Sequence, residues 1–185
     1  RDTVPGTPYV GSFISQAALA LLVIPVLLLL RSPPAIGQAG PSGGRSLGQI
    51  LRAPRFMLAV ATGVVSYGLM AFVMTAAPIA MVGHGLSVDD AALGIQWHLL
   101  AMFGPSFFTG KLMARFGKER VTAVGMALIA VAAAIGLSGV AVAHFWATLI
   151  VLGVGWNLSF IGATAMVTDC PTPEERAMAQ GANDF

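Results

Sequence analysis

Charged residues and cysteines are scarce in this sequence. Asp, Glu, Lys and Arg make up only 10% of its 185 residues, whereas soluble domains carry about 25%. Hydrophobic residues make up 56%, and the mean hydropathy is +0.81. So little charge cannot cover a surface that faces water, and we expect lipid to surround most of the chain. The single cysteine, Cys170, excludes an intramolecular disulfide and a metal site built from cysteines.

Acidic residues are missing from the middle of every long apolar stretch. The eight acids are Asp2, Asp89, Asp90, Glu119, Asp169, Glu174, Glu175 and Asp184. An intramembrane hydrolase or transferase, which is one alternative, needs paired carboxylates, a serine with a base, or a metal cluster at depth. The sequence also has no glycine-rich loop of the phosphate-binding type. We therefore expect no enzyme activity, no cofactor, no metal and no nucleic-acid partner.

Five apolar stretches are each long enough to cross a membrane as a helix, which takes about 20 residues. They are residues 13–30, 56–82, 88–111, 121–142 and 145–168. Helices are expected because lipid offers the backbone no hydrogen-bond partner, and the alternation typical of barrel strands is missing. The predicted fold is an all-α, polytopic transmembrane helical bundle.

The segments between these stretches have the composition of loops. Residues 31–55 are rich in Pro, Gly and Ser and are predicted to form a flexible linker. Ser87 is a predicted N-cap, and only the region around His144 separates the last two stretches. Residues 172–175 have the pattern of a capping box, which predicts a further helix from about residue 173. The chain starts without Met, and we expect it to be a piece of a longer protein.

Positive charge is distributed very unevenly between the two predicted sides of the membrane. Nine of the ten Lys and Arg residues lie in residues 31–55, in residues 111–120 or in the tail after 168, and only Arg1 lies on the other side. Cytoplasmic loops of membrane proteins carry an excess of Lys and Arg. We therefore predict a multi-pass protein of the bacterial inner membrane, with these three segments in the cytoplasm.

Polar and aromatic residues lie at mid-membrane depth in three of the five stretches. On a rise of about 1.5 Å per residue, residues 96–98 and 156–157 lie roughly 15–17 Å below the outer helix ends. Transporter sites are found at this depth. The candidate substrate-pathway residues are Tyr67, Thr75, Gln96, Trp97, His98, Trp156 and Asn157. Stretches 13–30 and 121–142 carry few polar residues and are predicted to be peripheral.

Each strong candidate has a structural alternative. Asn157 is either a hydrogen-bonded bridge between helices or a solute contact. His98 is a buried structural histidine, a solute contact or a proton carrier. Trp97 and Trp156 either pack against neighbouring helices or offer a flat face to a ligand.

A basic segment, GKLMARFGKER, joins the third and fourth stretches at residues 110–120. It resembles the signature loop of the major facilitator superfamily, which reads Gly, three residues, Asp, a basic residue, any residue, Gly and two basic residues. The positions that match are Gly110, Arg115, Gly117, Lys118 and Arg120, with Phe116 between the second and third. Ala114 stands where the pattern has Asp, so the family's ion pair lacks its acid there, and Glu119 separates the two basic residues. The alternative is an ordinary short basic loop.

The resemblance implies that the five stretches are helices six to ten of that family. Residues 1–30 would then be a periplasmic loop and helix six, 31–55 the cytoplasmic central linker, and 56–185 the second-half bundle with the start of helix eleven. The family's helices six and nine are peripheral, in agreement with the polar pattern. The implied function is secondary active transport of a small organic solute by alternating access.

The implied partners are the lipid bilayer, the solute and a proton as coupling ion, for a protein that is monomeric when full length. An aromatic-lined cavity would suit a planar organic solute. The alternative from a different class is a non-transporting membrane scaffold or sensor.

Overall fold

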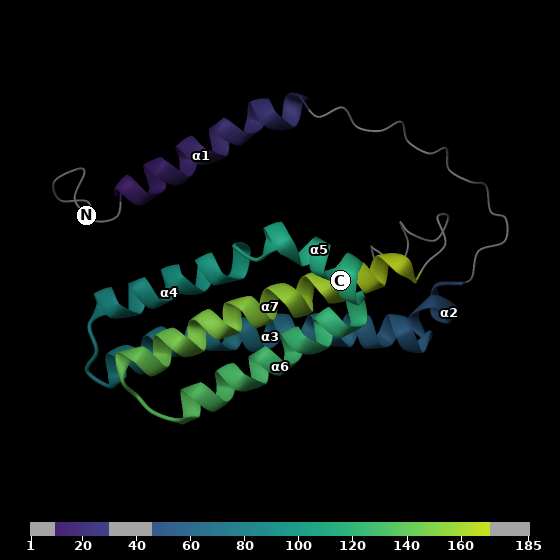
Figure 1. Ribbon diagram of the computed structural model, residues 1–185. Helices are drawn as coiled ribbons and strands as arrows, with labels where there is room; N and C mark the ends of the chain where they lie inside the picture. Colours follow the sequence, from purple (N-terminus) through teal and green to yellow (C-terminus); the bar gives the residue numbers. More distant parts are fainter. Residues whose placement is uncertain (1–9, 30–45, 171–185) are drawn as a thin grey trace. The chain divides into compact units, whose positions relative to one another are not determined.

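The computed structural model describes residues 10–29 and 46–170, and every regular element in them is a helix (Figure 1). This confirms the predicted all-α class. The chain divides into two compact units, Arg1–Ser42 and Gly43–Phe185. The first unit contains α1 (Val10–Leu29), an apolar helix with Pro25 in its interior.

The second unit is a bundle built around α7 (Val142–Asp169). The helices α3 (Pro54–Gly83), α4 (Val88–Phe103), α5 (Ser106–Phe116) and α6 (Lys118–Leu137) all contact α7. In the most apolar part of α7, 56% of the residues are buried, against 17% in α3 and 28% in α6. The core of the unit therefore lies along α7, while α3 and α6 turn most of their surface outward.

Three helices in the described residues are long and apolar enough to cross a membrane, namely α3, α6 and α7. The apolar helix over Phe13–Leu29 in the first unit is shorter. The prediction of one helix over residues 88–111 is wrong, because two helices, α4 and α5, meet at Gly104–Pro105. Proline has no N–H to continue the helical ladder and its ring crowds the preceding turn. Pro78, in contrast, lies inside α3 without ending it.

A short helix, α2 (Leu47–Leu51), lies inside the range predicted to be a linker. Its Ile50 is fully buried and packs with Phe56, Ala59, Met166 and Val167. This cluster joins α2 to the first turns of α3 and the last turns of α7. The remainder of the linker, residues 31–45, and the predicted capping box at 172–175 lie outside the described residues.

Two further helix ends were predicted with mixed success. The N-cap at Ser87 is confirmed, because the Asp90 backbone N–H donates to the Ser87 hydroxyl at 3.0 Å. The helix predicted over 121–142 instead ends at Leu137, and His144, which was placed between helices, lies in the first turn of α7. The turn between α6 and α7 therefore comes several residues earlier than predicted.

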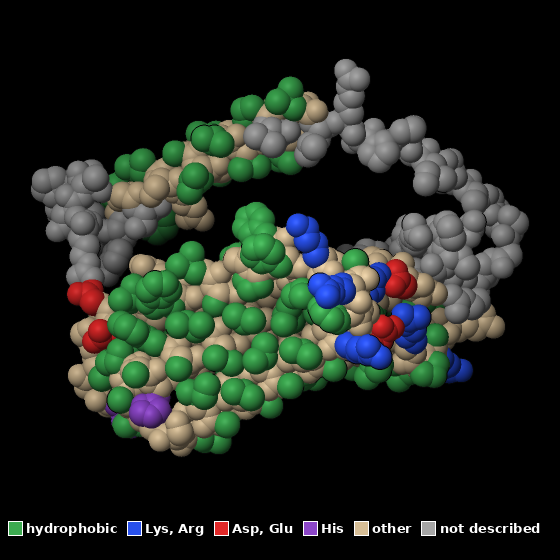
Figure 2. Space-filling view, in the orientation of Figure 1, with side chains coloured by type: hydrophobic (Ala, Val, Ile, Leu, Met, Phe, Trp, Pro, Cys, Tyr) green, Lys and Arg blue, Asp and Glu red, His purple; other side chains and the backbone are tan. Residues whose placement is uncertain are grey.

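Lys and Arg side chains gather at one end of the second unit, whereas hydrophobic side chains cover its length (Figure 2). Arg55 at the start of α3 donates to Glu119 of α6 at 2.5 Å. Lys118, the first residue of α6, lies 2.6 Å from Asp169, the last residue of α7. The start of α3, the α5–α6 turn and the end of α7 thus share one end of the unit, which we call the basic end. If residues 31–55, residues 111–120 and the tail after 168 lie on one side of the membrane, as the sequence predicts, these three helix ends must lie together.

Candidate functional site

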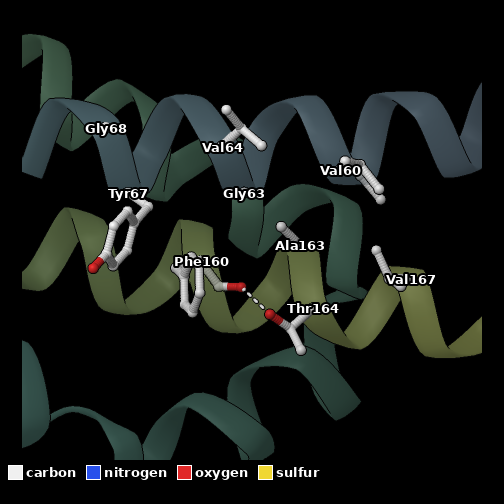
Figure 3. Close-up of a pocket in the computed structure, with 10 residues that line it drawn as sticks. Val60, Gly63, Val64, Tyr67, Gly68, Phe160, Ala163, Thr164 and Val167 are labelled. Carbon is white, nitrogen blue, oxygen red and sulfur yellow. Dashed lines mark hydrogen bonds between the residues drawn. The ribbon is translucent and has the colours of Figure 1, made fainter. Parts of the chain in front are cut away.

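A groove of about 560 Å³ lies between α3 and α7 and is the candidate solute site (Figure 3). Tyr67 and Phe160 lie next to each other at one end of the groove, and Val60 and Val167 lie at the other. The remaining lining residues are small or aliphatic apart from Thr164: Ala59, Gly63, Val64, Gly68, Ala163 and Thr164. Sites for small organic ligands have this size and this mostly apolar character.

The sequence explains why α3 and α7 leave room between them. A Cβ atom added at Gly63 would lie 3.8 Å from the Cβ of Ala163, which is ordinary van der Waals contact. A Cβ at Gly68 would meet nothing within 4 Å. Small side chains along this helix contact leave space for a groove, and the aromatic rings of Tyr67 and Phe160 close one end of it.

Three aromatic side chains form a row, of which Tyr67 and Phe160 line the groove and Trp156 does not. The rings of Trp156 and Phe160, four residues apart on one face of α7, are stacked with centroids 4.8 Å apart and planes 11° apart. Phe160 in turn lies 6.0 Å from the ring of Tyr67 on α3, tilted by 43°. The structure therefore brings together two predicted residues, Tyr67 and Trp156. Sequence reasoning missed Phe160, which links them, although its position one helical turn after Trp156 was the signal that could have found it.

The row also has polar groups. The Thr164 hydroxyl donates to the Phe160 carbonyl of its own helix at 3.0 Å, and Tyr67 is 54% exposed with its hydroxyl at the end of the groove. The indole N–H of Trp156 is buried and has no hydrogen-bond partner within the described part of the chain. A buried donor without a partner is costly, so a ligand or a neighbouring group that accepts from it would be stabilised.

Asn157 is fully buried, and its side chain is engaged by α4 and α5 on both sides of the Gly104–Pro105 break. Its amide donates to the Met102 carbonyl and to the Ser106 hydroxyl, each at 2.7 Å, and it accepts from the Thr109 hydroxyl. Both amide hydrogens and the carbonyl oxygen are thereby used. This geometry matches the interhelical alternative, and a direct solute contact for Asn157 stays a prediction.

His98 of α4 is fully buried against α7. Its Nδ1 lies 2.8 Å from the Leu149 carbonyl oxygen, and because a carbonyl only accepts, Nδ1 carries the hydrogen in this bond. The other ring nitrogen, Nε2, is buried and has no partner in the residues that the structure describes. Its lone pair is therefore free to accept a hydrogen bond or a proton.

Three predicted candidates lie away from the groove. The hydroxyl of Thr75 is exposed and donates to the Ala71 carbonyl of its own helix at 2.9 Å. Gln96 and Trp97 of α4 are exposed, whereas His98 of the same helix is buried. None of the three lines the groove.

The predicted signature loop is mostly helical. Lys111 and Arg115 belong to α5, and Lys118 and Arg120 to the first turn of α6, so Gly117 alone separates the two helices. Gly117 has φ +89°, a conformation that residues with a side chain rarely adopt. The ion pairs at this turn use Glu119 and Asp169, which pair with Arg55 and Lys118.

Comparison with known proteins gives a consistent picture. The family model described as Major Facilitator Superfamily matches residues 4–185. The riboflavin transporter RfnT of Brucella anthropi is 66% identical over 189 residues, which cover 100% of this chain and 47% of that protein. The uncharacterized MFS-type transporter YddS of Bacillus subtilis is 31% identical over 202 residues, which cover 99% of this chain and 45% of that protein.

The chain therefore spans about half the length of these curated relatives. No solved structure gives a significant match.

Proposed function

Since the chain belongs to the major facilitator superfamily, we propose that the whole protein is a secondary active transporter whose solute is riboflavin or a close flavin analogue. The observation that carries this proposal is the 66% identity to the riboflavin transporter RfnT over the entire chain. The chain spans less than half of that relative. The proposal therefore concerns the whole protein, of which the chain contributes one set of helices.

The chemistry of the groove supports a flavin. The isoalloxazine ring system of riboflavin is flat, with apolar faces and a hydrogen-bonding edge. The stacked rings of Phe160 and Trp156, with Tyr67 beside them, offer a matching flat aromatic surface. The buried Trp156 N–H and the Tyr67 hydroxyl belong to side chains that both contact Phe160, and they are the groups that we propose for the polar edge. We therefore propose Tyr67, Trp156 and Phe160 as the solute-contacting residues of this part of the chain.

We further propose the transport mechanism that the family implies. The chain would supply helices six to ten, and its groove would face the other half of the protein, which rocks against it around a site near the membrane midplane. The basic end would lie in the cytoplasm, as the excess of Lys and Arg predicts. A proton is the proposed coupling ion. Among the described residues, His98 with its free Nε2 is the titratable group placed to carry it at mid-membrane depth.

Flux measured with the full-length protein tests the proposal. Cells that neither make nor import riboflavin would express it, and labelled riboflavin would be followed into cells and into inverted membrane vesicles, with and without a protonophore. We expect saturable flux that unlabelled riboflavin competes and that the protonophore abolishes. If other solutes move and riboflavin does not, the solute is wrong. If a well-inserted protein moves no solute at all, the scaffold or sensor alternative replaces transport.

A matched pair of variants locates the site. Phe160→Ala removes the middle ring of the aromatic row and is expected to weaken riboflavin binding about tenfold, because it loses stacking and apolar contact. Trp97→Ala removes an aromatic ring of α4 that lies outside the groove and is expected to leave binding unchanged. Quenching of riboflavin fluorescence by the purified protein reports binding directly. Equal losses in both variants would move the site away from the α3–α7 groove.

A further inference from the structure

A second groove, of about 260 Å³, lies between α5 and α6 with its floor on α7. Its lining residues are apolar except for one arginine: Leu112, Phe116, Arg120, Val121, Val124 and Leu158. We call it the α5–α6 groove. It shares no lining residue with the solute groove between α3 and α7.

One arginine lines the α5–α6 groove, and a second lies against one of its lining rings. Arg120 lines it from the first turn of α6. On the α5 side, the guanidinium of Arg115 lies 5.3 Å from the centre of the Phe116 ring, which itself lines the groove. Lys111 precedes Arg115 by four residues and so lies on the same face of α5.

These cations have no carboxylate partner in the described residues. The two ion pairs at the basic end use Arg55 with Glu119 and Lys118 with Asp169. The cations left over within residues 46–170 are Arg52, Lys111, Arg115 and Arg120. Arg120 lines the groove, and Lys111 and Arg115 belong to the α5 helix that forms one of its walls; no carboxylate among residues 46–170 offsets the charge of these three side chains.

The length of α6 sets the depth of the groove in a membrane. Twenty residues rise about 30 Å, which equals the thickness of the hydrocarbon core. When α6 spans the membrane, Lys118 and Arg120 therefore lie at the level of the lipid headgroups, and Val124 lies in the acyl region. Arginine forks bind phosphate oxygens in pairs, and basic pockets between membrane helices suit anionic headgroups.

We propose that the α5–α6 groove is a binding site for one anionic phospholipid. The phosphate would bind Arg115 and Arg120, and an acyl chain would lie along Leu112, Phe116 and Val124. The inference is independent of the transported solute. A bound lipid there would occupy the exposed apolar wall between α5 and α6, where Phe116 and Val124 are 49% and 53% exposed.

Native mass spectrometry of the full-length protein in mild detergent tests this proposal. Phosphatidylglycerol and phosphatidylcholine with identical acyl chains are the probes, and retention of each lipid is measured. We expect phosphatidylglycerol to be retained in preference. The double variant Arg115→Gln/Arg120→Gln is expected to lower its retention by about fivefold per arginine. Val124→Trp fills the groove without changing charge and is expected to lower retention as well.

Arg52→Gln is the matched control, because Arg52 is a cation outside the groove that pairs with no carboxylate among residues 46–170. It should retain the lipid as the unaltered protein does. Equal loss in Arg52→Gln would show diffuse attraction to the basic end and overturn the site, as would equal retention of phosphatidylcholine or no loss in the double variant. Displacement of the lipid by inorganic phosphate alone would overturn the acyl part of the proposal, since the occupant would then be a free anion.

Discussion

The two sides of α7 are packed in opposite ways. Towards α6, a Cβ added at Gly125 would lie 2.8 Å from the Gly155 carbonyl oxygen and would overlap the Ser159 backbone nitrogen. Towards α3, a Cβ at Gly68 would meet nothing within 4 Å, and the groove remains open. Both sides use small residues, but α3 is close to α7 over only part of its length, where Ser66 and Ser159 share a buried hydrogen bond at 2.6 Å and a Cβ at Gly63 would contact Ala163.

The residues at the two contacts differ in size. Between α6 and α7 glycine meets glycine, so nothing holds the backbones apart. Between α3 and α7 the rings of Tyr67 and Phe160 lie with centroids 6.0 Å apart, and the small residues beyond them line the groove. A glycine in a membrane helix therefore indicates close packing only when the residue opposite is also small. The side of α7 that faces α6, which we call the closed side, is tightly packed and suits a rigid contact. The side that faces α3, which we call the open side, has a groove that suits a ligand.

The largest loss of stability should come from adding a methyl group at the tight contact between α6 and α7. Gly125→Ala places a methyl group against backbone atoms of α7 that cannot rotate away, and we expect a loss of about 3 kcal/mol or more in the free energy of unfolding. Gly68→Ala, on the open side, is the matched control and should cost nothing, since alanine is the better helix former. Denaturation of each purified variant in mixed micelles gives both values. Similar behaviour of the two variants would mean that the sides of α7 do not differ.

A smaller loss of stability is expected at Asn157, the side chain of α7 that forms hydrogen bonds with both α4 and α5. Asn157→Ala removes three hydrogen bonds and leaves the Met102 carbonyl at the helix break without that partner. We expect a loss of about 1–2 kcal/mol and faster hydrogen exchange in α5 than in α3. Thr62→Ala, whose hydroxyl bonds only its own helix, is the control. Unchanged exchange in α5 would show that Asn157 does not hold the break.

The smallest effect should come from the ion pairs at the basic end. Arg55→Gln breaks a pair whose side chains are 58% and 61% exposed, and solvent screening limits its contribution to below about 1 kcal/mol. Lys118→Gln should cost somewhat more, because Lys118 is 32% exposed and also donates to the Ala165 carbonyl at 3.1 Å. Thermal unfolding at low and high salt measures both. A larger cost for Arg55→Gln would reverse the expected order of the two pairs.

Patterns within a few residues were the reliable part of the sequence analysis. The Ser87 cap follows from a serine placed directly before an apolar stretch whose first turn holds Asp89 and Asp90, and the apolar stretches indicated the helical class because lipid offers the backbone no hydrogen-bond partner. The family followed from the Gly110–Arg120 spacing, which the family match over residues 4–185 bears out. The short α2 was missed, because its helix depends on Ile50 meeting Met166 and Val167 from far along the chain.

The site depended on contacts that no local pattern contains. Pro105 stands inside the stretch 88–111, but nothing local indicates that Asn157, more than 50 residues later, bridges a break there. Phe160 had no polar atom to draw attention, and its role arises from Tyr67 on another helix. Glu119 was treated as an interruption of the basic pair, whereas in three dimensions it supplies the acid that pairs with Arg55.

The break at Gly104–Pro105 would allow α5 to tilt relative to α4 as a rigid helix. The backbone hydrogen bonds of α5 begin at the Pro105 carbonyl, which accepts from the N–H groups of Phe108 and Thr109 at 2.8 and 2.9 Å. Tilting α5 therefore leaves its internal hydrogen bonds intact. The eleven residues of α5 make a helix about 16 Å long, so a tilt of about 10° about Pro105 would move Phe116 and the Gly117 turn by about 3 Å. A tilt that shifts the atoms beside Asn157 only slightly would therefore move the Gly117 turn far enough to break a hydrogen bond or an ion pair there.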